Sequence, residues 1–364
     1  MECDLMREPT KEADMKAAVL YGQEDLRVEE APEPSPGPGQ IKIANAYAGI
    51  CGSDLHYYFA LDSIPFDVHT PHPLTGATLP QILGHEFSGT VVEVGEGVTD
   101  VAVGDRGAVH PMVTACGQCP GCRRGAPMTC PLIGALGATA VGGGLSEFVV
   151  ANASQFHKIP DSVSLRNAAL VEPMSVAWHG VARSGVPVGG TALIAGAGPI
   201  GIGAWFALRA HGVDKILVSE PSAERRAMVE ALGATVVDPV ERDLAAAVAD
   251  LTGGDGVDVV IEAAGAGPAF ESGVAALAPT GRVVVLSLHE HPTSLNPTHL
   301  MIAQREIVGA VGYEDGEFDA VIAAMADEVY DTTGWVEERT LDDIVDALHL
   351  LRSGGGSKIL LRIG

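Results

Sequence analysis

Apolar residues follow two different patterns along the chain. Over about the first 170 residues, short apolar runs alternate with turns rich in proline and glycine, such as residues 31–39. These runs predict strands at residues 16–20, 41–46, 89–94 and 148–150. Many short strands joined by such turns indicate a β-rich domain built as a barrel or a sandwich.

From residue 191 onward, apolar strands alternate with helices. The pattern predicts helices at residues 199–210 and 222–232, which end at Gly212 and Gly233. Alternation of this kind indicates a parallel sheet covered on both faces, and hence an α/β fold. The strands of that sheet are predicted at 191–195, 215–219, 235–237, 257–262, 282–288 and 306–311.

These patterns divide the chain into four segments. A length of 364 residues is enough for two domains, each with its own core. A helix at 341–351 and a strand at 358–361 are expected to return to the first domain. The expected segments are a solvated extension (1–14), a β-rich domain (15–170), an α/β domain (171–315) and a returning C-terminal segment (316–364).

Charge and composition narrow the possible partners. The formal net charge of −25 opposes nucleic-acid binding, which depends largely on basic residues. Residues 1–16 are rich in charge and lack an apolar core, so they do not form a secretory signal. The uncharged stretch at 191–208 is long enough for a membrane span, but glycine and proline interrupt it. We therefore expect a cytoplasmic protein with no nucleic-acid and no membrane partner.

Four cysteines lie close together in a Gly/Pro-rich loop, in a C-x2-C-x2-C-x7-C pattern. In a chain of this size, clustered thiols are typical of metal ligands in a reducing compartment rather than of disulfides. Four thiolates fill every position of a tetrahedral Zn²⁺, which predicts a structural zinc site. Its ligands are expected to be Cys116, Cys119, Cys122 and Cys130.

A G-x-G-x-x-G sequence follows the strand at 191–195 and opens the helix at 199–210. In this setting its glycines permit a tight turn and a close approach to a pyrophosphate, which the helix N-terminus would bind. Glu220 lies at the spacing, about 20 residues, expected for an acid that binds a ribose and favours NAD over NADP. Arg225 and Arg226 just beyond complicate this preference because they could tolerate a phosphate. The loop residues are Gly196, Gly198, Pro199, Ile200 and Gly201.

A second, nonlocal set of residues could bind a catalytic metal. Cys51, His85, Glu86 and Glu172 supply a thiolate, an imidazole and carboxylates, which together suit Zn²⁺. Three protein ligands would leave one position for a substrate. Each residue also has an ordinary structural interpretation: a buried thiol, a core histidine or an acid at a helix N-terminus.

Five motifs in this order resemble the zinc-dependent medium-chain dehydrogenase/reductase family. They are residues 49–56 (GICGSDLH), residues 84–89 (GHEFSG), the four-cysteine loop, residues 171–173 (VEP) and the glycine loop. The resemblance covers nearly the whole chain from Met15. Residues 71–76 (PHPLTG) are similar to the butanediol dehydrogenase branch of that family, and the Glu172 motif is similar to its sorbitol dehydrogenases.

The resemblance implies a β-rich GroES-like catalytic domain and a Rossmann domain with a doubly wound parallel sheet, with zinc and NAD between them. It implies Cys51 and His85 as ligands, with Glu86 or Glu172 joining them directly or through water. Ser53 and His56 would form a proton relay past the nicotinamide ribose, and Tyr57 would contact substrate. Residues at the carboxyl ends of later strands would contact the cofactor: Ala264, Leu286, Leu288 and Val311.

We therefore predict an enzyme that moves a hydride between a secondary alcohol and NAD, with two zinc ions per chain. A vicinal diol, 2,3-butanediol, with acetoin as the ketone, is the preferred substrate pair; a sorbitol-like polyol and L-threonine are the alternatives. A nucleotide-binding regulatory protein without activity is the alternative of a different class. By family analogy the chain is expected to form a homodimer or homotetramer.

Overall fold

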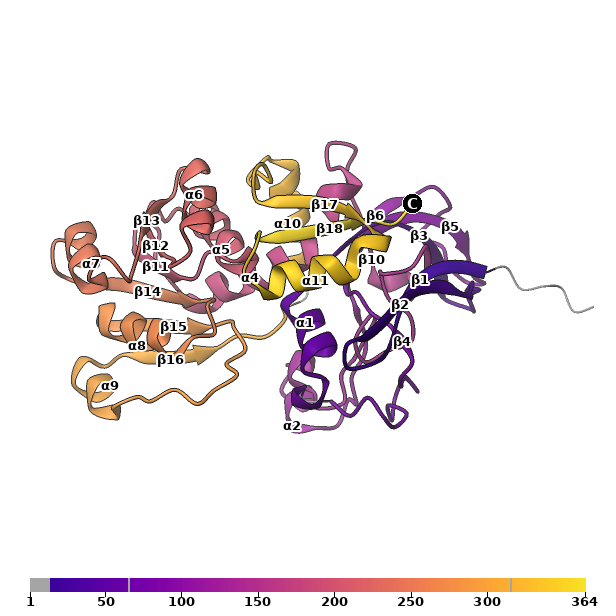
Figure 1. Ribbon diagram of the computed structural model, residues 1–364, viewed down its shortest axis with the longest axis horizontal. Coiled ribbons are helices and arrows are strands. Elements are labelled where there is room, and N and C mark those ends of the chain that lie inside the picture. The colour runs from indigo at the N-terminus through magenta and orange to yellow at the C-terminus, as the bar shows by residue number, and fades with distance from the viewer. Residues whose placement is uncertain (1–13, 65, 315) are drawn as a thin grey trace, which may run out of the picture.

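The computed structural model describes residues 14–64, 66–314 and 316–364. The predicted extension at 1–14 thus lies outside the described residues, apart from Asp14. Figure 1 shows two halves side by side, one rich in strands near the N-terminus and one in which helices cover a sheet. Within the described ranges, no helix combines the length and the apolar character needed to cross a membrane.

Two sheets form the β-rich half. A seven-stranded sheet has the order β10-β6-β5-β3-β18-β17, with β9 also paired to β3, and a three-stranded sheet has the order β2-β1-β4. A small ribbon of β7 and β8 lies beside them. The strands are β1 (Asp14–Gly22), β2 (Asp25–Pro32), β3 (Gln40–Gly49), β4 (Gln81–Ile82), β5 (Glu86–Val94), β6 (Arg106–Val109), β7 (Met112–Thr114), β8 (Gly134–Ala135), β9 (Phe148–Asn152), β10 (Phe156–Lys158), β17 (Val336–Thr340) and β18 (Lys358–Arg362).

Short helices close this half. Ile41 and Ile43 of β3 share one apolar core with Tyr57 of α1 and Leu348 of α11, so a helix from each end of the chain covers the same sheet. The helices are α1 (Gly52–Phe59), α2 (Pro120–Arg123), α3 (Leu165–Ala168) and α11 (Ile344–Arg352). Single 3₁₀ turns occupy Leu61–Ser63, Pro127–Thr129, Ala153–Gln155 and Leu341–Asp343.

The second half is a six-stranded sheet of order β13-β12-β11-β14-β15-β16, in which every pair is parallel. Counted from β11, this is the order 3-2-1-4-5-6 of dinucleotide-binding folds, with its switch point between β11 and β14. The strands are β11 (Thr191–Ala195), β12 (Lys215–Ser219), β13 (Thr235–Val237), β14 (Val257–Glu262), β15 (Leu277–Val285) and β16 (Glu306–Gly309).

Helices cover both faces of this sheet. Ala192 and Ile194 of β11 join the core under α4, α5 and α10, whereas Leu193 between them joins the core under α7 and α8. Strands buried on both faces explain why the sequence shows continuous apolar runs here. The helices are α4 (Val171–Ser184), α5 (Pro199–Ala210), α6 (Ala223–Ala231), α7 (Leu244–Thr252), α8 (Gly267–Ala276), α9 (Pro297–Ala303) and α10 (Glu317–Ala326).

The predicted α/β class, a doubly wound parallel sheet beside a β-rich domain, is confirmed. Two predicted strands end too late, because β15 stops at Val285 and β16 at Gly309. The apolar residues after β15 do not extend the strand. Leu286 packs on Gly180 of α4, and Leu288 is 65% exposed. Of the helices in this half, only α5 and α6 were predicted with bounds, and α4, α7, α8, α9 and α10 were not.

The C-terminal strand crosses back into the first half. Strand β18 pairs antiparallel with β3, with Leu360 opposite Gly49, and parallel with β17 (Figure 1). The pairing carries Lys358, which is 1% exposed, into the interior of the β-rich half. A buried charge there needs a partner.

Candidate active site

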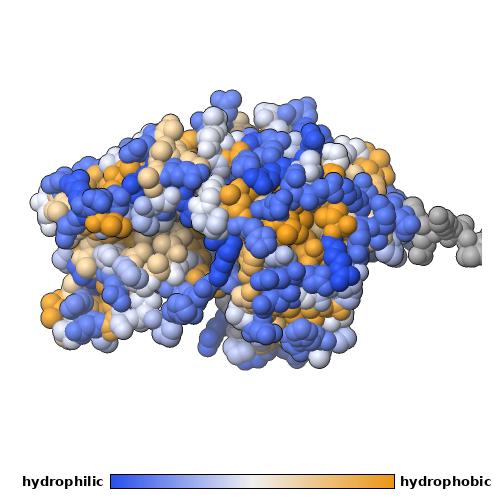
Figure 2. All heavy atoms as spheres, in the orientation of Figure 1, coloured by the Kyte–Doolittle hydropathy of each residue, from blue (hydrophilic) through white to orange (hydrophobic). Residues whose placement is uncertain are grey.

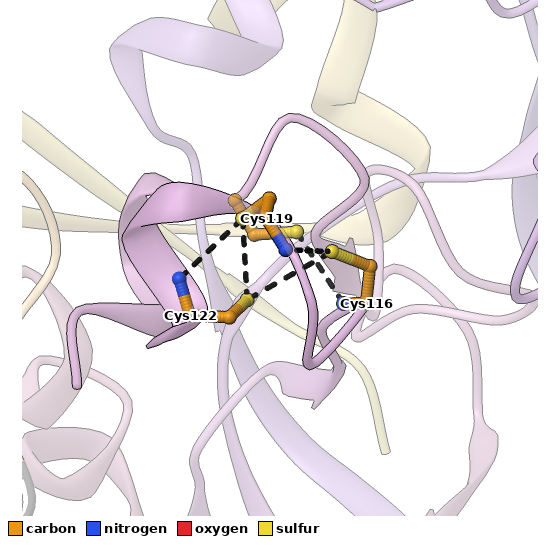
Figure 3. Close-up of side chains that lie close together, drawn as sticks. Cys116, Cys119 and Cys122 are labelled. Carbon is orange, nitrogen blue, oxygen red and sulfur yellow. Dashed lines mark hydrogen bonds between the residues drawn. The ribbon is translucent and has the colours of Figure 1, made fainter. Parts of the chain in front are cut away.

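Cys116, Cys119 and Cys122 point toward one another in the loop around α2 (Figure 3), and Cys130 completes the group. Their ligand atoms all lie within 4.8 Å of one another, and the Sγ atoms of Cys119 and Cys122 are 3.4 Å apart. That separation is too long for a disulfide, and all four cysteines are free. The arrangement fits a closed tetrahedral metal site formed by Cys116, Cys119, Cys122 and Cys130.

Backbone amides of the loop point at these sulfurs. The N–H groups of Cys119 and Cys122 donate to the Sγ atoms of Cys116 and Cys119, at 3.2 and 3.4 Å. The N–H groups of Cys116 and Leu132 both donate to the Sγ of Cys130 at 3.4 Å. Hydrogen bonds of this kind favour the thiolate over the thiol, the form that a metal requires.

A second group of donors brings together residues from two loops. Ligand atoms of Cys51, His85 and Glu86 lie within 4.8 Å of one another. Cys51 is the N-cap residue of α1, and Glu86 opens β5 opposite Gly49 of β3. A Cβ at position 49 would overlap the Glu86 carboxylate, so this glycine provides the space that the acid occupies.

Glu86 also forms a buried ion pair with Lys358, and each side chain is 1% exposed. Lys358 Nζ donates a further hydrogen bond to the carbonyl oxygen of Ile50 at 2.8 Å. The lysine therefore holds one Glu86 oxygen from the side of β18. A buried pair of this kind is costly to break, because removing one partner leaves the other charge uncompensated.

Asp54 supports both Cys51 and His85, a role that the sequence reasoning missed. Its Oδ2 accepts a hydrogen bond from the Cys51 backbone N–H at 2.8 Å. Its Oδ1 lies 3.9 Å from His85 Nδ1, and both atoms are buried without a hydrogen-bond partner among the described residues. Burial raises the pKa of Asp54, which the His85 ring opposes. A carboxylate behind a ligating imidazole orients the ring and raises its basicity.

Glu172 stands at the edge of the three-donor group rather than within it. It begins α4, is 9% exposed and makes no hydrogen bond to a described residue. Burial raises the pKa of Glu172 to about 7, with Glu86 adding to the shift and His85 opposing it. An almost buried carboxylate without a partner can accept a ligand or a metal-bound group.

The charge balance of this site calls for a cation. Burial by itself lowers the pKa of His85, yet the pKa stands well above its usual value because Cys51, Asp54 and Glu172 surround the ring. In the described residues, Lys358 is the one lysine or arginine paired with this acidic group. The donors, a thiol, an imidazole and carboxylates, are those of a catalytic zinc site with an open position.

The other residues predicted for catalysis, Ser53, His56 and Tyr57, all lie on α1. Ser53 Oγ lies 3.3 Å from His85 Nε2, beside the group of Cys51, His85 and Glu86. His56 Nδ1 donates to the Gly52 carbonyl at 2.9 Å, and its Nε2 lies 3.4 Å from Glu290 of the Rossmann half. In the described residues Ser53 and His56 share no hydrogen bond. The hydroxyl of Tyr57 is buried without a hydrogen-bond partner.

The glycine loop has the geometry that the dinucleotide motif requires. Gly196 has φ +101, which favours glycine, and a Cβ on Gly201 would overlap the Gly196 carbonyl oxygen. Among the described residues, apart from its chain neighbours, no atom lies within 4 Å of where a Cβ on Gly198 would be, so the backbone is open to a ligand. Pro199 and Ile200 form the first turn of α5, with its free amides.

The loop forms one wall of a cavity of about 450 Å³ at the carboxyl edge of the sheet. Glu220, Arg225 and Ala264 line this cavity. Figure 2 shows a hollow bordered by weakly hydrophobic side chains on this half of the molecule. Glu220 Oε2 accepts from the Ala197 backbone N–H at 2.8 Å, so the acid is fixed beside the glycine loop.

A buried carboxylate at the end of β14 was also missed. Glu262 is fully buried and accepts from the backbone N–H groups of Ala264 and Gly265, at 3.0 and 2.9 Å. It also binds the Ser287 hydroxyl, and His289 Nε2 at 3.0 Å. Glu262 thus ties the loop after β14 to the loop after β15, where Leu286 and Leu288 lie. The sequence signal was an acid ending an otherwise apolar strand.

Two family models match the chain. A model described as an alcohol dehydrogenase GroES-like domain matches residues 37–161, and one described as a zinc-binding dehydrogenase matches residues 199–327. The (R,R)-butanediol dehydrogenase of Bacillus subtilis (strain 168) is 39% identical over 352 residues, which cover 96% of this chain and 99% of that protein. The chain belongs to the zinc-dependent medium-chain dehydrogenase/reductase family.

Other comparisons agree with this family. The crystal structure of 2R,3R-butanediol dehydrogenase from Bacillus subtilis superposes with a TM-score of 0.89 at 38% identity, covering 96% of this chain and 100% of that one. The sorbitol dehydrogenase of Bacillus subtilis (strain 168) is 32% identical over 339 residues, covering 92% and 93%. The predicted family, the GroES-like domain and the enzyme class of zinc-dependent alcohol dehydrogenase are confirmed.

Two glycines of this dehydrogenase should respond differently to alanine. Gly201→Ala forces the backbone of the glycine loop apart and should lower the free energy of unfolding by about 1–3 kcal/mol. Gly198→Ala meets no protein atom and should leave the melting temperature almost unchanged, yet weaken NADH binding. Thermal melting and NADH fluorescence titration measure the two effects. Wild-type NADH affinity in Gly198→Ala would contradict the placement of the pyrophosphate.

Proposed function

We propose that this protein is an NAD-dependent, zinc-containing dehydrogenase of vicinal diols, which interconverts 2,3-butanediol and acetoin. The observation that carries the proposal is the cluster of Cys51, His85 and Glu86, with the 9% exposed Glu172 near enough for its charge to act on the His85 ring. A chain 39% identical to a butanediol dehydrogenase over nearly its full length supports the choice of substrate.

Cys51 and His85, with Glu86 or Glu172, would hold a catalytic zinc, and the four clustered cysteines would hold a structural one. When bound, the catalytic ion supplies Lewis-acid chemistry that makes a hydroxyl easier to deprotonate. Asp54 holds the backbone of Cys51 and faces the His85 ring, so it fixes two donors together. Reduced cysteines of this kind suit a cytoplasmic protein.

Ser53 and His56 would move the proton away from the substrate. Ser53 Oγ lies beside the group of Cys51, His85 and Glu86, 3.3 Å from His85 Nε2, and can accept a proton from a substrate hydroxyl. His56 lies one helical turn further along α1, beside Glu290 at the boundary between the two halves. A bound cofactor ribose could bridge the two side chains, which do not touch each other.

NAD rather than NADP is the proposed cofactor. Glu220 is fixed beside the glycine loop, where its charge would repel a 2′-phosphate. Arg226, which could otherwise attract that phosphate, is paired with Asp238 at 2.7 Å and donates to the Glu220 carbonyl oxygen. Arg225 lines the cavity and donates to the carbonyl oxygen of Gly356 at 3.3 Å.

Steady-state kinetics with a panel of alcohols tests the proposal. We expect the highest kcat/KM with a 2,3-butanediol enantiomer and, in the reverse direction, with acetoin. We also expect kcat/KM to be at least about tenfold higher with NAD than with NADP. The reason is that losing or opposing one charged contact costs about 1.4 kcal/mol or more, which corresponds to a factor of about ten. Sorbitol and L-threonine are the competing substrates. A higher kcat/KM with either would replace the diol. Absence of activity with every alcohol would favour the nucleotide-binding regulatory protein.

Zinc content tests the two metal sites separately. Mass spectrometry that measures the zinc content of the purified protein should find about two zinc ions per chain. Cys51→Ser should lose one ion and the activity while it keeps its melting temperature nearly unchanged. Cys122→Ser should lose the other ion and melt at a lower temperature. A single ion in the wild type would contradict the presence of both sites.

A homodimer through the edge of the parallel sheet is the proposed assembly. Strand β16 ends the strand order, and its Ile307 is 38% exposed. Met301 and Ile302 of the adjacent α9 are 69% and 73% exposed. An open strand edge flanked by exposed apolar residues readily pairs with a second copy.

Ile307→Lys should weaken that pairing, because charge on an edge strand opposes strand addition. Light scattering after size exclusion should give the mass of a dimer, or of a tetramer built from dimers, for the wild type and a smaller mass for the variant. Val188→Lys, at an 84% exposed residue distant in sequence from β16, is the control. A monomeric wild type would refute this assembly.

A further inference from the structure

Glu290 connects the two halves of the molecule. It lies in the loop at 286–296, which joins β15 to α9 in the Rossmann half. Its Oε1 lies 3.4 Å from Nε2 of His56 in α1 and 3.4 Å from Nη1 of Arg352 in α11. Both of these helices belong to the GroES-like half. One carboxylate oxygen of the Rossmann half thus contacts two helices of the other half.

Arg352 is held against α1 as well as against Glu290. Its guanidinium carbon lies 5.9 Å from the centroid of the Phe59 ring, at the end of α1. A cation at this distance over an aromatic face is attracted by the ring. The side chains of Glu290 and Arg352 are 49% and 50% exposed, so their ion pair lies at the surface of the boundary between the halves.

The ring of His56 presents one particular nitrogen to Glu290. Its Nδ1 donates to the Gly52 carbonyl oxygen at 2.9 Å, and because a carbonyl oxygen only accepts, Nδ1 carries a proton. In the neutral ring Nε2 is then the unprotonated nitrogen, and it takes up the next proton. A proton that arrives at His56 is therefore bound at the atom that faces the Glu290 carboxylate.

The loop that carries Glu290 is anchored at its start. Ser287 and His289 both bind Glu262, the fully buried acid at the end of β14, with His289 Nε2 at 3.0 Å. Hydrogen bonds to a carboxylate are stronger than those between neutral groups. Glu290 directly follows His289, so its contacts with α1 and α11 act on the anchored segment at 286–289. Two of the predicted cofactor contacts lie in that segment.

We propose that Glu290 is a positioning residue of the dehydrogenase. Through Arg352 it docks the loop at 286–296 onto the GroES-like half, and it holds His56 in the orientation that the proton relay uses. The inference rests on the proposed function, because the relay and the cofactor belong to that function. Exposed ion pairs contribute little to the stability of a fold, so this contact serves cofactor binding and turnover rather than folding.

Glu290→Gln removes the charge and keeps the size of the side chain. Glu337→Gln is the matched control, since Glu337 pairs with Arg339 at 2.8 Å and its side chain is 48% exposed. Both residues of that control pair lie on β17, within the GroES-like half. The two substitutions therefore remove a similar surface ion pair, one between the halves and one within a single half. Both variants should melt close to the wild type.

Hydrogen exchange of the protein without cofactor reports the docking of the loop directly. We expect the amides of residues 286–290 to exchange about two- to fivefold faster in Glu290→Gln, the range that corresponds to one exposed ion pair, and at the wild-type rate in Glu337→Gln. Fluorescence titration should show NADH binding weakened by a similar factor. The kcat for alcohol oxidation should fall about tenfold, because a misplaced His56 loses part of the contribution of acid–base catalysis.

A charge swap separates the two contacts of Glu290. Glu290→Arg alone brings like charges together and should weaken NADH binding more than Glu290→Gln does. Combining Glu290→Arg with Arg352→Glu restores an ion pair between the loop and α11, so the NADH affinity and the exchange rate should return close to those of the wild type. The kcat should stay low in this double variant, because a cation then faces His56.

Loop exchange in Glu290→Gln equal to that in Glu337→Gln would overturn the proposal, and so would a wild-type kcat in Glu290→Gln. A double variant that binds NADH no better than Glu290→Arg alone would overturn it too, since the loop would then not dock through Arg352. Wild-type protein that oxidises no alcohol would instead overturn the proposed function. The two failures are distinguishable because hydrogen exchange is measured without substrate or cofactor.

Discussion

The burial of negative charge between the two halves is the constraint around which the site is organised. Glu86, Asp54 and Glu172 are each at least about nine-tenths buried, and Cys51 adds a thiol to them. Of these acids, Lys358 forms an ion pair with Glu86 in the part of the chain that the structure describes. Buried carboxylates in such numbers are costly unless cations or donors compensate for them. These donors fit a positive ion, in keeping with a family whose model is described as a zinc-binding dehydrogenase.

The fold brings these groups together from distant parts of the chain. Cys51 and Asp54 come from the start of α1, Glu86 from β5, Glu172 from α4 and Lys358 from the strand that returns at the end. None of these elements could place the donors alone. The parallel sheet contributes the dinucleotide cavity, and Glu262 ties two of its loops together behind that cavity. The group of Cys51, His85 and Glu86 and the cofactor cavity are thus built from different elements of the fold.

The sequence was most informative where a local pattern carries the chemistry. The glycine loop, the four-cysteine loop and the strands at 191–195 and 215–219 depend on neighbours in the chain, and the structure has the same elements there. Lys358, Asp54 and Glu262 were missed because their significance depends on what tertiary packing brings beside them. The end of β15 was misjudged because Leu286 and Leu288 are apolar for reasons unrelated to strand pairing.

The ion pair between Glu86 and Lys358 joins residues separated by 272 positions. During synthesis, the GroES-like half can form most of its sheet long before Lys358 exists. Until strand β18 has been made and inserted beside β3, the carboxylate of Glu86 lacks its fixed counterion. Completion of the group formed by Cys51, His85 and Glu86 is thereby linked to the arrival of the last strand rather than to completion of the sheet that contains most of its elements.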